Sequence, residues 1–149
     1  MTNNNNLDAV YKQISDGMRK FSSNEEKMEY LSSALYDSFD HYFWVGFYYP
    51  NEKEMTIGPS AGPPACASIG YQGVCGAAHN AGKSVIVANV DDFPGHITCD
   101  PNSKSEIVVP VKNSNDDIIA LLDVDSDQLD AFHETDALFL EKLVSELSD

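Results

Sequence analysis

Residues 106–124, EIVVPVKNSNDDIIALLDV, decide the fold class more clearly than any other part of the chain. Two apolar runs, Glu106–Val111 and Ile118–Val124, flank the polar segment Asn-Ser-Asn-Asp at 113–116. Apolar, β-branched runs separated by such a segment are typical of a β-hairpin with a loop longer than two residues. The stretch therefore predicts two adjacent antiparallel strands.

Three further segments also predict strands. Tyr42–Tyr49 (YFWVGFYY) is aromatic and β-branched, a short strand is expected near 55–57, and Ser84–Val90 forms another. Residues 58–76 hold five glycines and three prolines, so we expect little regular structure there apart from a short helix that starts near Val74.

Apolar residues at helical spacing predict helices at both ends of the chain. The first stripe is Leu7, Val10, Tyr11, Ile14 and Met18, and the second is Met28, Leu31, Leu35 and Phe39. Ser22 or Ser23 caps the second helix with Glu25 or Glu26 as its partner, and a last helix starts near Glu134. Helices flanking strands joined mostly by turns predict an α+β fold with an antiparallel sheet. We expect one domain over 1–149, with a frayed Asn-rich terminus at 1–6.

The charge balance excludes several kinds of partner. The 149 residues carry 24 Asp and Glu against 9 Lys and Arg, a formal net charge of −15, and Arg19 is the only arginine. Nucleic acids and anionic membranes require clustered basic residues, so neither is an expected partner.

The N-terminal sequence and the lack of a long apolar run predict a cytosolic protein, and in that compartment the three cysteines need an explanation. Met1–Asn6 lacks the basic and apolar regions of a signal peptide, and no apolar run is long enough to span a membrane. Disulfide frameworks are rare in the cytosol, and Cys66, Cys75 and Cys99 are odd in number. The cysteines therefore need a catalytic, metal-binding or plain packing role.

Cys99 lies in the most unusual segment, Phe93–Val109 (FPGHITCDPNSKSEIVV), which begins as a long loop. Backbone N–H groups that are free of regular pairing, together with His96 or Lys104 as a cation, would lower the pKa of its thiol. The alternative is that Cys99 is a small buried apolar residue, as many free cysteines are.

Cys66 and Cys75 also lie in segments rich in glycine and proline, whereas core cysteines usually lie on strands or helices. This placement favours a redox cycle in which one thiolate accepts oxygen and a second cysteine resolves the sulfenic acid as a disulfide. A zinc site made of His96, Cys99, Cys66 and Cys75 is the rival, but only one pair of these ligands has the usual close spacing.

Three acidic residues stand out from the general acidity. Asp123 and Asp125 are two positions apart on a strand and so share a face, and Glu106 opens the preceding strand. Repelling carboxylates on one face favour a bound cation, a shared proton or a substrate ammonium group. The alternative is a strand end that is exposed to solvent. Trp44 is either a core residue or the wall of a ligand site.

Five stretches closely resemble the GAF-domain free methionine-(R)-sulfoxide reductases: Trp44–Tyr48, Gly58–Cys66, Gly73–Gly76, Phe93–Pro110 and Leu122–Ser126. The likeness covers roughly residues 40–145. It implies a GAF-like fold, a six-stranded antiparallel sheet with flanking helices packed on one side, including the N- and C-terminal helices. It also implies a frequently dimeric state and no metal or organic cofactor.

The resemblance also implies an activity, the reduction of free L-methionine (R)-sulfoxide to L-methionine. Cys99 would be the catalytic thiol, either Cys66 or Cys75 would resolve it, and thioredoxin would reduce the resulting disulfide. The nine positions from Cys66 to Cys75 are one fewer than in other members, so the choice of resolving cysteine stays open.

The resemblance assigns the substrate-binding residues as well. Glu106 would hydrogen-bond to or protonate the departing oxygen, and Asp123 and Asp125 would bind the α-ammonium group. Trp44 would form an aromatic wall. The alternative function is a GAF-type sensor module that binds a small ligand without turnover, which leaves the three cysteines unexplained.

Overall fold

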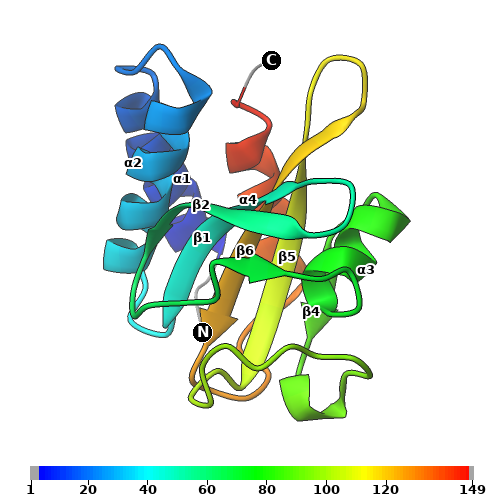
Figure 1. Cartoon of the computed structure of the whole chain (residues 1–149). Helices are drawn as coiled ribbons and strands as arrows, with labels where there is room; N and C mark the ends of the chain where they lie inside the picture. Colours follow the sequence, from blue (N-terminus) through cyan, green and yellow to red (C-terminus); the bar gives the residue numbers. More distant parts are fainter. Residues whose placement is uncertain (1–3, 148–149) are drawn as a thin grey trace.

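The computed structural model describes residues 4–147, and its centre is a six-stranded sheet in the order β3-β2-β1-β6-β5-β4 (Figure 1). All neighbouring strands are antiparallel. The strands are β1 (Trp44–Pro50), β2 (Met55–Ala61), β3 (Ser68–Ile69), β4 (Val85–Val87), β5 (Ser105–Lys112) and β6 (Ile118–Ser126). The sheet confirms the predicted α+β class.

The predicted hairpin is β5–β6, whose ladder runs from Ser105 opposite Ser126 to Lys112 opposite Ile118. β6, the second strand of the hairpin, also pairs with β1. These two strands therefore lie in the middle of the sheet. Along β6, Ala120, Leu122 and Val124 are buried in one core cluster while Leu121 lies in a second cluster on the other face. The period-two alternation of the sequence thus fixes which side chains reach each face.

Three helices cover one face of the sheet: α1 (Asn4–Met18), α2 (Asn24–Ser38) and α4 (Glu134–Val144) (Figure 1). The predicted stripes of α1 and α2 pack in the core on this face, where Val10 and Tyr11 are only partly buried. Ser23 caps α2, because its Oγ accepts a hydrogen bond from the N–H of Glu26. The Asn-rich segment 1–6 is helical from Asn4 onward, and residues 1–3 lie outside the described part of the chain.

The two ends of the chain meet at Glu146. Its carboxylate accepts hydrogen bonds from the hydroxyls of Ser15, at 2.7 Å, and of Tyr11. Arg19 Nε lies 3.4 Å from Glu146 Oε1. These contacts join α1 to the segment that follows α4. Arg19, the single arginine of the chain, therefore has a structural role.

The fourth helix, α3 (Val74–Ala81), packs on the opposite face of the sheet. Val74, Cys75 and Ala78 contact a second core cluster that includes Trp44 and Val108. The expectation that all helices pack on one side is therefore wrong, because α3 must cover apolar side chains that β1, β5 and β6 present on this face.

The largest differences from the predicted element boundaries concern β2, β3 and β4. β2 extends to Ala61, and β3 pairs with it through Met55 opposite Ile69, inside a segment expected to lack strands. The expected strand Ser84–Val90 is shortened to Val85–Val87 and is followed by a 3-10 turn at Val90–Asp92. Within residues 4–147, no helix has the length and apolar character needed to cross a membrane.

Candidate active site

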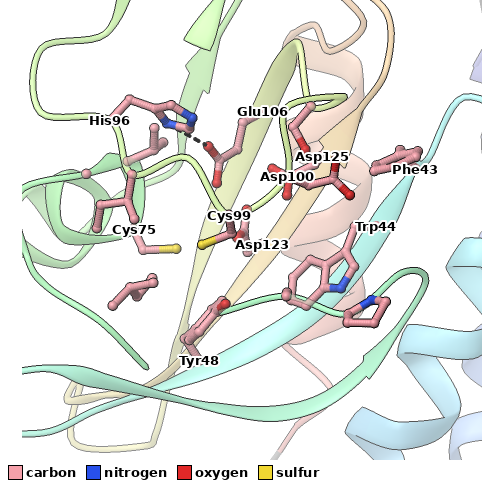
Figure 2. Close-up of a pocket in the computed structure, with 17 residues that line it drawn as sticks. Phe43, Trp44, Tyr48, Cys75, His96, Cys99, Asp100, Glu106, Asp123 and Asp125 are labelled. Atoms are coloured by element: carbon pink, nitrogen blue, oxygen red, sulfur yellow. Dashed lines mark ion pairs between the residues drawn. The ribbon is translucent and has the colours of Figure 1, made fainter. Parts of the chain in front are cut away.

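Three acidic side chains lie close together on the sheet face that α3 covers (Figure 2). Asp125 on β6 is opposite Glu106 on β5 and opposite Trp44 on β1. Trp44, Asp125 and Glu106 therefore form one row across three neighbouring strands. Asp123 lies two residues before Asp125 and shares its face, as the alternation along β6 predicts.

Gly46 gives the Trp44 indole its place in the pocket. A Cβ added at Gly46 would lie 2.4 Å from the indole Cη2 and 2.7 Å from Cβ of Ser60. The missing side chain thus lets the ring lie along β1, where it reaches Tyr48 with ring centroids 6.0 Å apart. The two rings form an aromatic wall beside the carboxylates (Figure 2).

Two loops lie over this part of the sheet, and a disulfide joins them. Cys66, in the connection between β2 and β3, is bonded to Cys99, in the loop before β5. Their Cα atoms are 5.4 Å apart although 33 positions separate them in the sequence. The structure therefore brings together two of the three cysteines that the sequence singles out, and Cys99 lines the pocket.

Tyr48 is a site residue that the sequence reasoning missed. Its hydroxyl donates a hydrogen bond of 2.8 Å to the carbonyl oxygen of Cys66, which fixes the loop that carries this cysteine. The signal was present, because residues 44, 46 and 48 alternate onto one face of β1. Phe43 and Asp100 also line the pocket and were not predicted.

Cys75 differs from the other two cysteines. It is free, 3% exposed, and lies in the first turn of α3 rather than in a loop. The flanking glycines have structural roles here: Gly73 is the N-cap of the helix, and a Cβ on Gly76 would lie 1.8 Å from the carbonyl oxygen of Tyr71. The short helix predicted from near Val74 is confirmed and contains Cys75, so this cysteine does not share the loop setting of Cys66 and Cys99.

The enclosed space is a pocket with an empty volume of about 610 Å³, including the part open to solvent. Apolar side chains of Ile69, Val74 and Ile97 complete its walls. Among the described residues that line it, none is lysine or arginine. The ionisable side chains of the pocket are therefore mainly acidic.

Burial raises the pKa values of the three acidic groups, and mutual repulsion adds to the effect for Glu106 and Asp125. Burial, reinforced by the two aspartates, raises the pKa of Glu106 well above its ordinary value. Burial and the nearby Asp123 likewise raise the pKa of Asp125, and burial raises that of Asp123 despite its hydrogen bonds. Carboxyl groups with raised pKa values are suited to donate a proton or to bind a cation.

The expected cations near Cys99 do not both reach the pocket. Lys104 is exposed, and its ammonium group donates a hydrogen bond of 3.5 Å to the carbonyl oxygen of Pro101. His96 does line the pocket, with Nδ1 4.0 Å from Glu106 Oε1 (Figure 2). Burial lowers the pKa of His96, so its imidazole is mainly neutral at neutral pH.

The zinc site considered from the sequence does not form in this structure. Cys66 and Cys99 are bonded to each other, so neither sulfur is available as a thiolate ligand. A different set of groups is close enough to share an ion: ligand atoms of Cys75, Glu106 and Asp123 all lie within 4.8 Å of one another.

Comparisons with known proteins define the class first. The GAF-domain family model matches residues 25–148, and the fold is that of a GAF domain. The chain is 44% identical over 121 residues to GAF domain-containing protein A of Dictyostelium discoideum, which covers 80% of this chain and 75% of that protein.

Two further relatives narrow the class. The chain is 36% identical over 138 residues to the free methionine-R-sulfoxide reductase of Saccharomyces cerevisiae, covering 89% of this chain and 77% of that protein. It superposes with a TM-score of 0.89 and 38% identity on the free methionine-R-sulfoxide reductase of Neisseria meningitidis in complex with its substrate, covering 95% of this chain and 85% of that one. The chain belongs to the free methionine-R-sulfoxide reductase family of GAF-domain proteins.

Proposed function

We propose that this protein reduces free L-methionine (R)-sulfoxide to L-methionine. The observation that carries the proposal is the position of Cys99, which is bonded to Cys66 and lines the same pocket as Glu106, Asp123 and Asp125. A redox-active thiol beside acidic groups provides both the electrons and the proton that the reaction needs. The names of the relatives support the same substrate.

The proposed cycle balances through two cysteines. The Cys99 thiolate attacks the sulfoxide sulfur, the oxygen passes to Cys99, and methionine leaves. The resulting sulfenic acid reacts with the Cys66 thiol to form the disulfide and one water. Sulfoxide and two thiols thus become thioether, disulfide and water. The pairing in the structure favours Cys66 over Cys75 as the resolving cysteine.

Glu106 is the proposed proton donor to the sulfoxide oxygen. Its pKa is raised by burial and by the two aspartates, so its carboxyl stays protonated at a higher pH than an exposed glutamate. A group with its pKa shifted toward the working pH is an effective general acid.

Asp123 and Asp125 are the proposed ligands of the α-ammonium group. Asp123 Oδ1 is buried and accepts no hydrogen bond within the described part of the chain, so an ammonium N–H would satisfy it. A methionine residue within a peptide lacks this charge, which would make the pocket selective for the free amino acid. Trp44 packs against the S-methyl group, and backbone N–H groups near Cys99 bind the carboxylate in this proposal.

The proposed reductant of the Cys66–Cys99 disulfide is thioredoxin, whose dithiol supplies two electrons by exchange. The cycle as written requires no bound metal or organic cofactor. A homodimer and a cytosolic location stay predictions from the sequence.

The activity is tested by mixing the protein with an equal mixture of the (R)- and (S)-sulfoxides of free L-methionine and a thioredoxin-recycling system, and by following NADPH oxidation. We expect consumption to stop when half of the sulfoxide is reduced, because only the (R) epimer at sulfur is a substrate. Background consumption would refute the proposed activity and, if the ligand still bound, would favour the sensor alternative.

Cysteine variants test the assigned roles. Cys99→Ser should abolish turnover, whereas Cys66→Ser should form one methionine per protein and then stop without recycling. The matched variant is Cys75→Ser, for which we expect repeated turnover. Mass spectrometry of the oxidised parent should find the Cys66–Cys99 bridge, and a Cys75–Cys99 bridge would reverse the roles of Cys66 and Cys75.

A further inference from the structure

The Cys75 thiol is the one buried nucleophile of the pocket that the proposed cycle leaves unused. It lies in the first turn of α3 and points into the pocket beside Asp123 (Figure 2). Its sulfur and one carboxylate oxygen each of Glu106 and Asp123 lie within 4.8 Å of one another, and all three side chains are buried. A thiol and two carboxylates in such proximity are a possible ligand set for one ion.

An unpartnered atom points to a cationic ligand at the same place. Among the described residues, Asp123 Oδ1 is one of two buried side-chain polar atoms that have no hydrogen-bond partner, and the residue is 6% exposed. An unpaired buried acceptor destabilises the protein, more so where it is charged, and a bound cation removes that cost.

We propose that Cys75, Glu106 and Asp123 bind a thiophilic divalent cation such as Zn²⁺, with His96 as the fourth ligand. His96 Nδ1 lies 4.0 Å from Glu106 Oε1, on the same side of the pocket. Ligand atoms of a tetrahedral zinc ion are about 3.5 Å apart, given Zn–S near 2.3 Å and Zn–N or Zn–O near 2.1 Å. Small side-chain rotations are therefore enough to bring the ligand atoms of Cys75, Glu106 and Asp123 to these distances, and His96 would move with Glu106 to complete the set.

The ligand types select the ion. A thiolate and an imidazole favour Zn²⁺ over Mg²⁺ and Ca²⁺, which prefer oxygen ligands only. On binding, the Cys75 sulfur gives up its proton to solvent and forms the metal–sulfur bond, with no change of oxidation state. The bound ion occupies Glu106 and Asp123, two of the three acidic groups assigned above to the substrate.

This overlap gives the site a regulatory consequence, which rests on the proposed function. An ion on Asp123 and Glu106 displaces the ammonium group and removes the proton donor. Zn²⁺ and methionine sulfoxide therefore exclude each other, and zinc acts as a reversible inhibitor that raises KM.

The binding site itself is tested with Co²⁺ on the disulfide-bonded protein, because Cys75 is then the only free thiol. We expect one ion per chain and a thiolate-to-cobalt charge-transfer absorption that Zn²⁺ abolishes by displacement. Cys75→Ser should remove this absorption and weaken binding by about 100-fold, and Asp123→Asn by at least about tenfold. The exposed Asp92→Asn is the matched control and should change neither.

Saturating Co²⁺ without charge-transfer absorption would overturn the proposal, as would equal affinity of the parent and Cys75→Ser. Cys75→Ala, checked for folding by circular dichroism, decides the point if serine disturbs the buried position. Inhibition by Zn²⁺ is measured separately on chelator-treated reductase. If the metal-free protein shows no turnover, the proposed function fails, while the Co²⁺ titration still decides the metal site.

Discussion

An Asp123→Asn variant removes one negative charge from the pocket while it keeps the size and shape of the side chain. Asp123 is 6% exposed, and its Oδ1 is the unpartnered acceptor assigned to the substrate ammonium group. The asparagine amide offers a neutral oxygen or an N–H group at the same place. We therefore expect a loss of substrate recognition with the fold unchanged.

The expected size follows from the burial of this contact. A hydrogen bond to a charged group contributes about 1.5–3 kcal/mol, and breaking one partner of a buried charge pair costs about 2–5 kcal/mol. A loss of about 2–4 kcal/mol corresponds to a roughly 30- to 1000-fold fall in kcat/KM, since each 1.4 kcal/mol is tenfold.

The assay compares free methionine sulfoxide with N-acetylmethionine sulfoxide, which lacks the ammonium charge, in the thioredoxin-coupled reaction. The parent should discriminate strongly between the two, and Asp123→Asn should lose most of that discrimination. Asp127→Asn, an exposed aspartate directly after the end of β6, is the matched control. A change in kcat/KM of less than about threefold in Asp123→Asn would refute the assignment, because the contact would then contribute well under 1 kcal/mol.

Three further variants test the pocket and the fold. Glu106→Gln should lower kcat by about 10²- to 10⁴-fold. The activity of the parent should fall as the pH rises through the raised pKa of Glu106, and a pH–rate profile of the variant should lack this fall. Gly76→Ala should destabilise the protein by about 1–3 kcal/mol in urea unfolding, because its Cβ would lie 1.8 Å from the Tyr71 carbonyl oxygen. Burial raises the pKa of Glu146, but its hydrogen bonds outweigh this effect, and the pKa is lowered. The carboxylate therefore stabilises the fold fully at pH values above its ordinary pKa. This contribution is lost as the pH falls through the lowered pKa. Glu146→Gln should therefore cost about 1–2 kcal/mol at neutral pH and little in acid, and an equal cost at both would contradict the linkage.

The sheet was predictable where local pattern and turn chemistry agree. The hairpin of β5 and β6 follows from its apolar alternation and its polar loop. The two-residue strand β3 could not be predicted, because Ser68–Ile69 has no periodicity of its own and forms by pairing with β2. Such a strand is fixed by tertiary contacts, which the local sequence does not carry.

The residues of the site could be predicted from the sequence, but most of the contacts between them could not. Alternation places Asp123 and Asp125 on one face, but the row with Glu106 and Trp44 depends on the register of three strands. The pairing of Cys66 with Cys99 depends on how two loops lie over the sheet. The short helix near Val74 that contains Cys75 was predicted, whereas the burial of this thiol depends on how the helix packs on the sheet.

The three carboxyl groups of the pocket need opposite protonation states for their proposed roles, and this predicts the shape of the pH–rate profile. Burial raises the pKa of all three groups, so Asp123 and Asp125 must lose protons before they can bind an ammonium group, whereas Glu106 must keep its proton to donate it. The value of kcat/KM should therefore rise with pH as the aspartates ionise and fall again as Glu106 ionises. Glu106→Gln should retain the acid limb and lose the alkaline one. A parent profile with a single limb would show that one set of carboxyl groups does not have the role assigned to it.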